Sequence, residues 1–161
     1  MATRMIEPRN PHSTLHIAGH PVHPMIIPLP IAFFIATFFC DVMYWGTENT
    51  EWSTAAYYLL LAAVISSIAA ALTGIIEYKG DKKIQQLSAA RKHMIGNTIV
   101  LILAVGNWYI RTDNRAEAIV PTGLLLSCVI FLLLLYTAWQ GGEMVYRKRV
   151  AVADSEPSGP V

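Results

Sequence analysis

Five side chains that can hold a metal ion or a cofactor are spread along this chain: His20, His23, Glu77, His93 and Glu143. Imidazole nitrogens and carboxylate oxygens bind zinc and iron, and a pair of imidazoles can hold a b-type haem. These residues are far apart in the sequence, so only the fold can bring them together. The chemistry therefore depends on the elements that carry them.

Four apolar runs carry or flank these side chains, at residues 25–45, 54–78, 93–110 and 119–139. Each run is close to the roughly 20 residues that cross a bilayer as a helix. If the chain crosses four times, the first and third helices begin at the membrane face where the second and fourth end. All five side chains lie at that face. We predict an all-α membrane protein with four transmembrane helices in an up-down-up-down bundle.

Composition and charge set the domain organisation and the orientation. The chain has 161 residues, of which 54% are hydrophobic and 14% charged, which leaves no room for a separate soluble domain. We expect a flexible cytoplasmic arm at 1–19, a transmembrane domain at 20–150 and a disordered tail at 151–161. Of the 12 Lys and Arg residues, all except Arg111 and Arg115 flank the shared face. The positive-inside rule then predicts two cytoplasmic termini, and a bacterial inner (plasma) membrane is the natural setting.

The leading functional hypothesis is a small electron-transfer subunit with a b-type haem at the cytoplasmic end of the bundle. In such a bundle the first and third helices face each other diagonally, which places His23 and His93 as axial ligands. His20 and Asn97 are expected to orient these ligands, and Glu77 to lie near a haem propionate or a proton route. Three small residues at a similar depth are expected to leave space: Thr73, Gly74 and Gly96.

Two alternatives stay open. The first is a non-haem zinc or iron site, whose ligands would come from His20, His23, His93, Glu77 and Glu143. The second is a structural or assembly subunit whose polar cluster only holds helices together. The partners expected are the lipid bilayer, a redox partner protein and, as a homo-oligomer, further copies of the chain. The sequence shows no nucleic-acid-binding motif. Membrane topology accounts for its basic residues.

The remaining polar residues receive plainer interpretations. Asp41 lies near the outer end of the first helix, where we expect it to be solvated at the surface. Asn107 is expected to form a hydrogen bond between helices. Cys40 and Cys128 lie within apolar runs and are expected to be unpaired thiols. The sequence shows no internal repeat.

Several short motifs resemble a known family. They are Gly19-His20-Pro21-Val22-His23-Pro24, Leu72-Thr73-Gly74, Arg91-Lys92-His93 and Gly141-Gly142-Glu143-Met144-Val145-Tyr146. Together they resemble the bacterial membrane family catalogued as domain of unknown function 2231, over about residues 19–152. The resemblance implies a four-helix membrane domain, and because some members are joined to redox modules it also implies electron transfer. Glu77 stands where an aspartate is common in that family.

Overall fold

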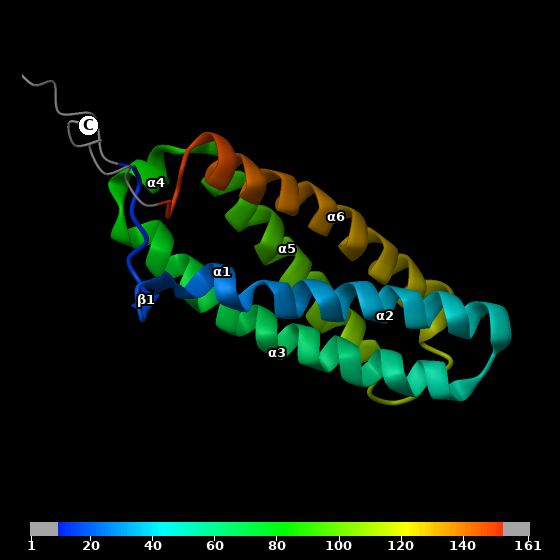
Figure 1. Cartoon of the computed structure of the whole chain (residues 1–161). Coiled ribbons are helices and arrows are strands. Elements are labelled where there is room, and N and C mark those ends of the chain that lie inside the picture. The colour runs from blue at the N-terminus through cyan, green and yellow to red at the C-terminus, as the bar shows by residue number, and fades with distance from the viewer. Residues whose placement is uncertain (1–9, 153–161) are drawn as a thin grey trace, which may run out of the picture.

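The computed structural model describes residues 10–152, and within this range it is predominantly helical (Figure 1). The elements in chain order are β1 (His16–Ile17), β2 (His20–Pro21), α1 (Val22–Ile26), α2 (Pro28–Thr47), α3 (Thr50–Gly80), α4 (Lys82–Gln86), α5 (Ser88–Ile110), η1 (Ile119–Gly123), α6 (Leu124–Gly142) and η2 (Glu143–Arg147). Four helical segments of the described chain are long and apolar enough to cross a membrane: Val22–Thr47, Thr50–Gly80, Ser88–Ile110 and Ile119–Arg147. The prediction of an all-α protein with four transmembrane helices is therefore confirmed.

Local sequence explains where the first two long helices begin and end. Pro28 occupies the first turn of α2, where its missing N–H removes no helical hydrogen bond. At the other end Glu48 adopts a left-handed conformation, with φ of 53°, which stops α2. Asn49 then caps α3, because its side chain accepts a hydrogen bond from the N–H of Glu51 at 2.9 Å. These residues turn α2 and α3 into a tight helical hairpin.

The four long helices pack as a bundle of two hairpins. Helix α2 packs against α3 and α6, and α5 packs against α3 and α6, so α2 and α5 occupy opposite corners. The centre of the bundle is apolar and contains Phe34, Leu60, Ala63, Val64, Val100, Ala104, Ile130 and Leu134. Many outward side chains are also apolar, such as Ile102 and Leu125, which suits a surface that faces lipid.

The two hairpins repeat one pattern of positions. His23 and His93 are 70 residues apart, and the same offset relates Asp41 to Arg111. It also relates three further pairs of buried residues: Pro30 with Val100, Phe34 with Ala104 and Thr37 with Asn107. Buried positions of α2 therefore recur in α5 with one spacing, although the residue types at these positions differ. The shared spacing of α2 and α5 is the kind of relation found in the parallel repeats of some membrane proteins.

The described part of the N-terminal region, residues 10–21, lies against the bundle, and we call this segment the strap. It contains the antiparallel pair β1 and β2, in which Ile17 is paired with His20. The N–H of Ala151 donates a hydrogen bond to the carbonyl of Pro11, so the strap also contacts the C-terminal segment. For these segments the sequence predicts a flexible arm at 1–19 and a disordered tail at 151–161, of which residues 1–9 and 153–161 lie outside the described part of the chain. Besides the bond from Ala151 to Pro11, Nδ2 of Asn10 donates a hydrogen bond to the carbonyl of Val152 at 3.2 Å, so the described residues of the two segments contact each other.

Candidate functional site

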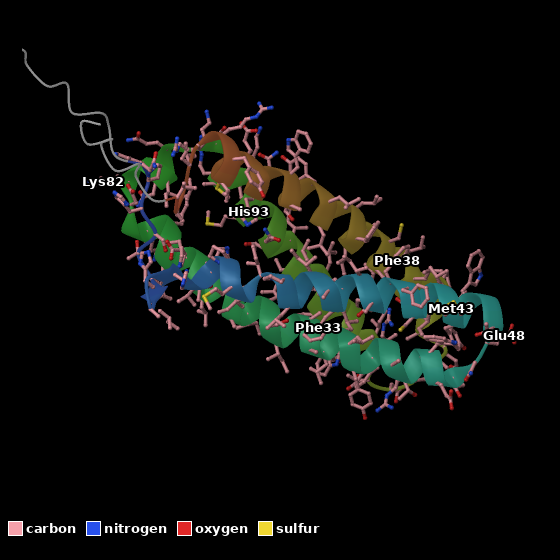
Figure 2. The ribbon with its side chains drawn as sticks, in the orientation of Figure 1. Phe33, Phe38, Met43, Glu48, Lys82 and His93 are labelled. Carbon is pink, nitrogen blue, oxygen red and sulfur yellow. The ribbon has the colours of Figure 1, made fainter. Side chains whose placement is uncertain are left out.

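The first candidate site is a pair of histidines that meet across the diagonal of the bundle. His23 comes from α1 and His93 from the second turn of α5, and their ring centroids lie 6.5 Å apart with the ring planes at 86°. Figure 2 places His93 at the end of the bundle that also carries Lys82, opposite to Glu48. We call this end the histidine end. The helical position of His23 differs from the extended conformation that the following proline predicts.

Both imidazoles are oriented by backbone carbonyl groups. Nδ1 of His23 lies 3.0 Å from the carbonyl oxygen of Ala70 and 3.1 Å from Oγ1 of Thr73. Nδ1 of His93 lies 2.9 Å from the carbonyl oxygen of Thr137. A carbonyl oxygen can only accept, so each Nδ1 carries the hydrogen, and the Nε2 of each neutral ring then has a free lone pair. This is the tautomer that metal-binding histidines commonly use.

A glycine lies next to each imidazole ring and leaves space for it. A Cβ atom at Gly74 would lie 3.1 Å from Cε1 of His23, and one at Gly141 would lie 3.4 Å from Cε1 of His93. Each glycine lies four residues after the residue whose carbonyl accepts the hydrogen bond, Ala70 or Thr137. Each imidazole therefore packs against the same local arrangement: a carbonyl group that accepts its hydrogen bond and, one helical turn later, a glycine.

The separation of the rings can be compared with the requirement of a shared metal atom. A metal bound to an imidazole nitrogen at about 2.0 to 2.1 Å lies about 3.2 Å from the ring centroid, since the nitrogen is about 1.1 Å from that centroid. Two such rings on opposite sides of one atom have centroids roughly 6.4 Å apart. The observed separation is 6.5 Å. The observed centroid separation is therefore close to that of two imidazoles bound to one metal atom.

The other predicted site residues contribute differently. His20 lies in β2, exposed, and among the described residues its imidazole has neither a hydrogen bond nor a ring contact. Asn97 donates to the backbone carbonyl of His93 at 2.8 Å and so does not orient the imidazole. Gly96 leaves no free space, because a Cβ there would lie 2.5 Å from Cγ2 of Thr137. Gly96 instead allows α5 and α6 to approach closely.

The two carboxylates predicted as metal ligands have protein partners. Oε1 of Glu77 accepts hydrogen bonds from Oγ of Ser13 at 2.7 Å and from the N–H of Leu15 at 3.1 Å, and Oε2 accepts from the N–H of Thr14 at 2.8 Å. Glu143 pairs with Arg147 at 3.3 Å. Within residues 10–152 no group of three or more His, Cys, Asp or Glu side chains is placed to hold a metal ion. Glu77 fastens the strap to α3.

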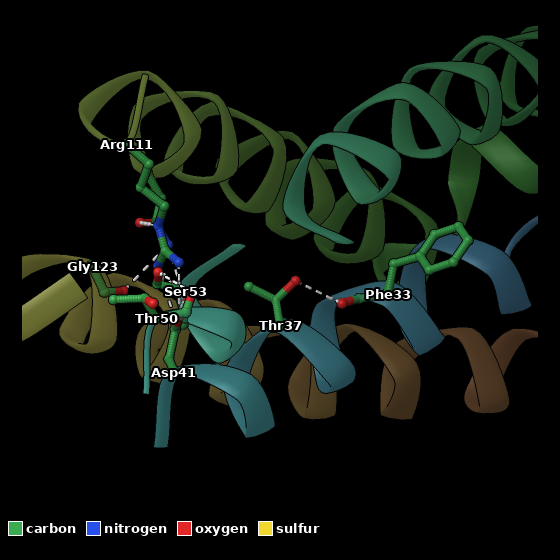
Figure 3. Close-up of polar contacts among 9 residues, drawn as sticks. Phe33, Thr37, Asp41, Thr50, Ser53, Arg111 and Gly123 are labelled. Carbon is green, nitrogen blue, oxygen red and sulfur yellow. Dashed lines mark hydrogen bonds and ion pairs between the residues drawn. The ribbon is translucent and has the colours of Figure 1, made fainter. Parts of the chain in front are cut away.

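A buried ion pair at the opposite end of the bundle is the feature that sequence reasoning missed. Nη1 and Nη2 of Arg111 donate to Oδ1 and Oδ2 of Asp41 at 2.7 and 2.8 Å, and both side chains have no solvent exposure (Figure 3). The expectation that Asp41 is solvated at the surface is wrong. We call this the ion-pair end.

Neighbouring side chains satisfy the remaining polar atoms of the ion pair. Nε of Arg111 donates to Oδ1 of Asn107 at 3.0 Å, and Oγ of Ser127 donates to Oδ2 of Asp41 at 2.6 Å. Asn107 also donates to Oγ of Ser127 at 3.0 Å, which confirms its predicted hydrogen bond between helices. A buried ion pair needs such additional hydrogen bonds, because desolvation of the two charges is otherwise unfavourable.

A constant spacing of residues in the sequence indicates this pair. Asp41 follows His23 by 18 positions, and Arg111 follows His93 by the same 18, so a repeat of 70 residues places the acid and the base at equivalent depths. The distribution of charges along the sequence groups Arg111 with Arg115 at the outer face. The repeat would have moved it into the bundle, opposite Asp41. Cys40 and Cys128 are free thiols, as predicted.

Comparisons with known proteins give one match. A family model described as "Predicted membrane protein (DUF2231)" matches residues 19–154. No curated protein and no solved structure matches the chain. The matched range contains both the histidine pair and the buried ion pair.

Proposed function

The chain belongs to the DUF2231 family of predicted membrane proteins, and from this premise we propose that it is a small electron-transfer subunit that holds a b-type haem between His23 and His93. The family match and the four apolar helices support an integral protein of the lipid bilayer. The finer assignment is supported by the histidine pair. The observation that supports the haem assignment most directly is the 6.5 Å ring separation, together with Nδ1 hydrogen bonds that leave both Nε2 lone pairs free.

The residues around the pair have definite roles in this proposal. Bound haem supplies one-electron chemistry at its iron. The carbonyls of Ala70 and Thr137 hold the two rings in the ligating tautomer and increase the basicity of Nε2. Gly74 and Gly141 let each ring lie close to its neighbouring helix. The strap lies against the histidine end of α3, where Glu77 accepts its hydrogen bonds.

The contacts at the two ends favour haem over the other functions considered. A non-haem ion would need further ligands, and the oxygens of Glu77 and Glu143 already accept bonds from the strap and from Arg147. A purely structural cluster is not needed at the histidine end, since the ion pair of Asp41 and Arg111 already links α2 to the end of α5.

The orientation and setting complete the proposal. Basic residues gather at the histidine end of the chain, which by the positive-inside rule favours a cytoplasmic location for that end and for both termini in a bacterium. A haem there lies near the cytoplasmic surface, within reach of a soluble or membrane-bound redox partner protein. Such a partner would exchange electrons with the haem in a complex that need not be permanent.

Visible absorption spectra test the proposal directly. The full chain is expressed with a haem supply, purified in detergent and measured oxidised and after reduction with dithionite, alongside elemental analysis. We expect sharp reduced bands and about one iron per chain. His23→Ala and His93→Ala should each abolish the bands, while His20→Ala, the matched control, should retain them. A colourless, metal-free wild-type protein, or bands that survive both ligand substitutions, would overturn the assignment.

A further inference from the structure

A polar groove lies at the histidine end, on the outside of the α5–α6 hairpin. It has a volume of about 460 Å³ and lies between the beginning of α5 and the end of α6. Its lining residues are Gln86, Leu87, Ser88, Ala89, Lys92, Trp139, Gln140, Glu143 and Lys148. None of these side chains takes part in the histidine pair.

The groove is cationic. Lys92 on α5 and Lys148 after η2 both line it, and within the described chain neither ammonium group has an acidic partner within salt-bridge distance. Glu143 also lines the groove, but its carboxylate is paired with Arg147 at 3.3 Å. Two unpaired ammonium groups from different elements therefore dominate the charge of the groove. Such a site favours an anion.

The beginning of α5 adds hydrogen-bond donors on the same side. No side chain caps this helix, so the N–H groups of Ser88 and Ala89, in its first turn, have no partner within the helix. The positive end of the helix dipole adds to the charge of the lysines. Free N–H groups, a helix N-terminus and two ammonium groups together match the oxygens of a phosphate group.

The depth of the groove points to a lipid as the source of the phosphate. Trp139 lines the groove and is 72% exposed, and Tyr146 on the adjoining η2 is 86% exposed. Exposed Trp and Tyr at the end of a transmembrane helix mark the headgroup region of a bilayer. A groove at this depth opens where phospholipid headgroups are, and basic pockets at the ends of transmembrane helices bind anionic lipids.

We propose that this groove binds the phosphate group of an anionic phospholipid, with Lys92 and Lys148 as the charged contacts. The lipid tail would then lie along the apolar outer surface of the α5–α6 hairpin, below Trp139. Neutral lipids with a choline headgroup are disfavoured, because their cation would face the two lysines. The site is independent of the proposed haem, since no residue of the groove ligates it.

Native mass spectrometry of the full chain, released from detergent, tests the proposal. The protein is titrated with phosphatidylglycerol, with phosphatidylcholine and with inorganic phosphate as a competitor. We expect a bound phosphatidylglycerol whose apparent affinity falls about 10-fold or more in the double variant Lys92→Gln/Lys148→Gln. The matched control, Lys79→Gln/Lys82→Gln, removes the same charge outside the groove and should change the affinity by less than about 2-fold.

Three results would overturn the proposal. Equal losses in the two double variants would show that total charge, and not the groove, attracts the lipid. Equal binding of phosphatidylcholine would remove the role of the anion. Displacement of the lipid by inorganic phosphate at similar concentration would assign the groove to a free anion. The lipid readout does not use haem absorption, so its failure and the failure of the proposed haem are separate results.

Discussion

The two ends of the bundle use equivalent positions in opposite ways. Asp41 and Arg111 meet at one end and His23 and His93 at the other, and each pair joins residues 70 positions apart. At the ion-pair end both side chains are fully buried and every charged atom has a partner. At the histidine end both rings are partly exposed and each neutral Nε2 lacks a partner in the described chain. The repeat therefore provides one closed contact and one with capacity for a ligand.

Removal of one charge at the ion-pair end should have the largest effect on stability. Arg111→Ala leaves Asp41 buried without a counter-charge, which should lower the free energy of unfolding by about 3 to 5 kcal/mol. Unfolding in an SDS titration, followed by circular dichroism, measures the change. The double variant Asp41→Leu/Arg111→Met removes both charges at similar volume and should recover much of the loss. A double variant as unstable as the single one would contradict the view that the unpaired charge causes the damage.

A smaller loss of stability is expected for a substitution at Gly123, where the backbone packs closely against the ion pair. A Cβ at Gly123 would lie 2.7 Å from the carbonyl oxygen of Ala118 and 2.9 Å from Nη2 of Arg111. Gly123→Ala should therefore lower the free energy of unfolding by about 1 to 3 kcal/mol. Gly106→Ala is the control, because nothing lies within 4 Å of a Cβ at Gly106, and it should be neutral or slightly stabilising. Equal behaviour of the two variants in the same SDS titration would be the contrary result.

The smallest effect on stability is expected at the histidine end. In protein without haem, His23→Ala removes the hydrogen bond to Ala70 and should change the free energy of unfolding by only about 1 kcal/mol. His93→Ala should behave alike, because its ring makes the equivalent bond to Thr137. Losses as large as that of Arg111→Ala in haem-free protein would mean that both ends are structural, and would favour the assembly subunit.

The sequence was sufficient for the four helices because each apolar run is close to the length that crosses a bilayer. Their bounds shifted where capping decides them: α3 begins at Thr50 because Asn49 caps it, four residues before the apolar run. The diagonal arrangement of His23 and His93 also followed from four crossings joined by short connections. The number of helices follows from the length of each apolar run. The diagonal pairing of His23 and His93 follows from the order of the helices that carry them, the first and the third, and both can be read from the sequence.

The contacts that were missed depend on orientation around each helix. Asp41 looked like a surface residue because its position along the helix suggested an interface, and nothing local indicated that it faces Arg111. Glu77 looked like a ligand because its depth matched that of the histidines, yet it holds the strap through Ser13 and Thr14. Which partner a polar side chain meets is set by the packing of helices distant in sequence, and only the offset of 70 hinted at it.

The buried ion pair also bears on the order in which this protein is made. Asp41 emerges from the ribosome 70 residues before Arg111. At roughly 5 to 20 residues per second, this interval is about 4 to 14 s. During that time the first hairpin carries Asp41 without the cation that neutralises it in the finished fold. A chain that stops before residue 111 therefore lacks the counter-charge that neutralises Asp41 in the finished fold.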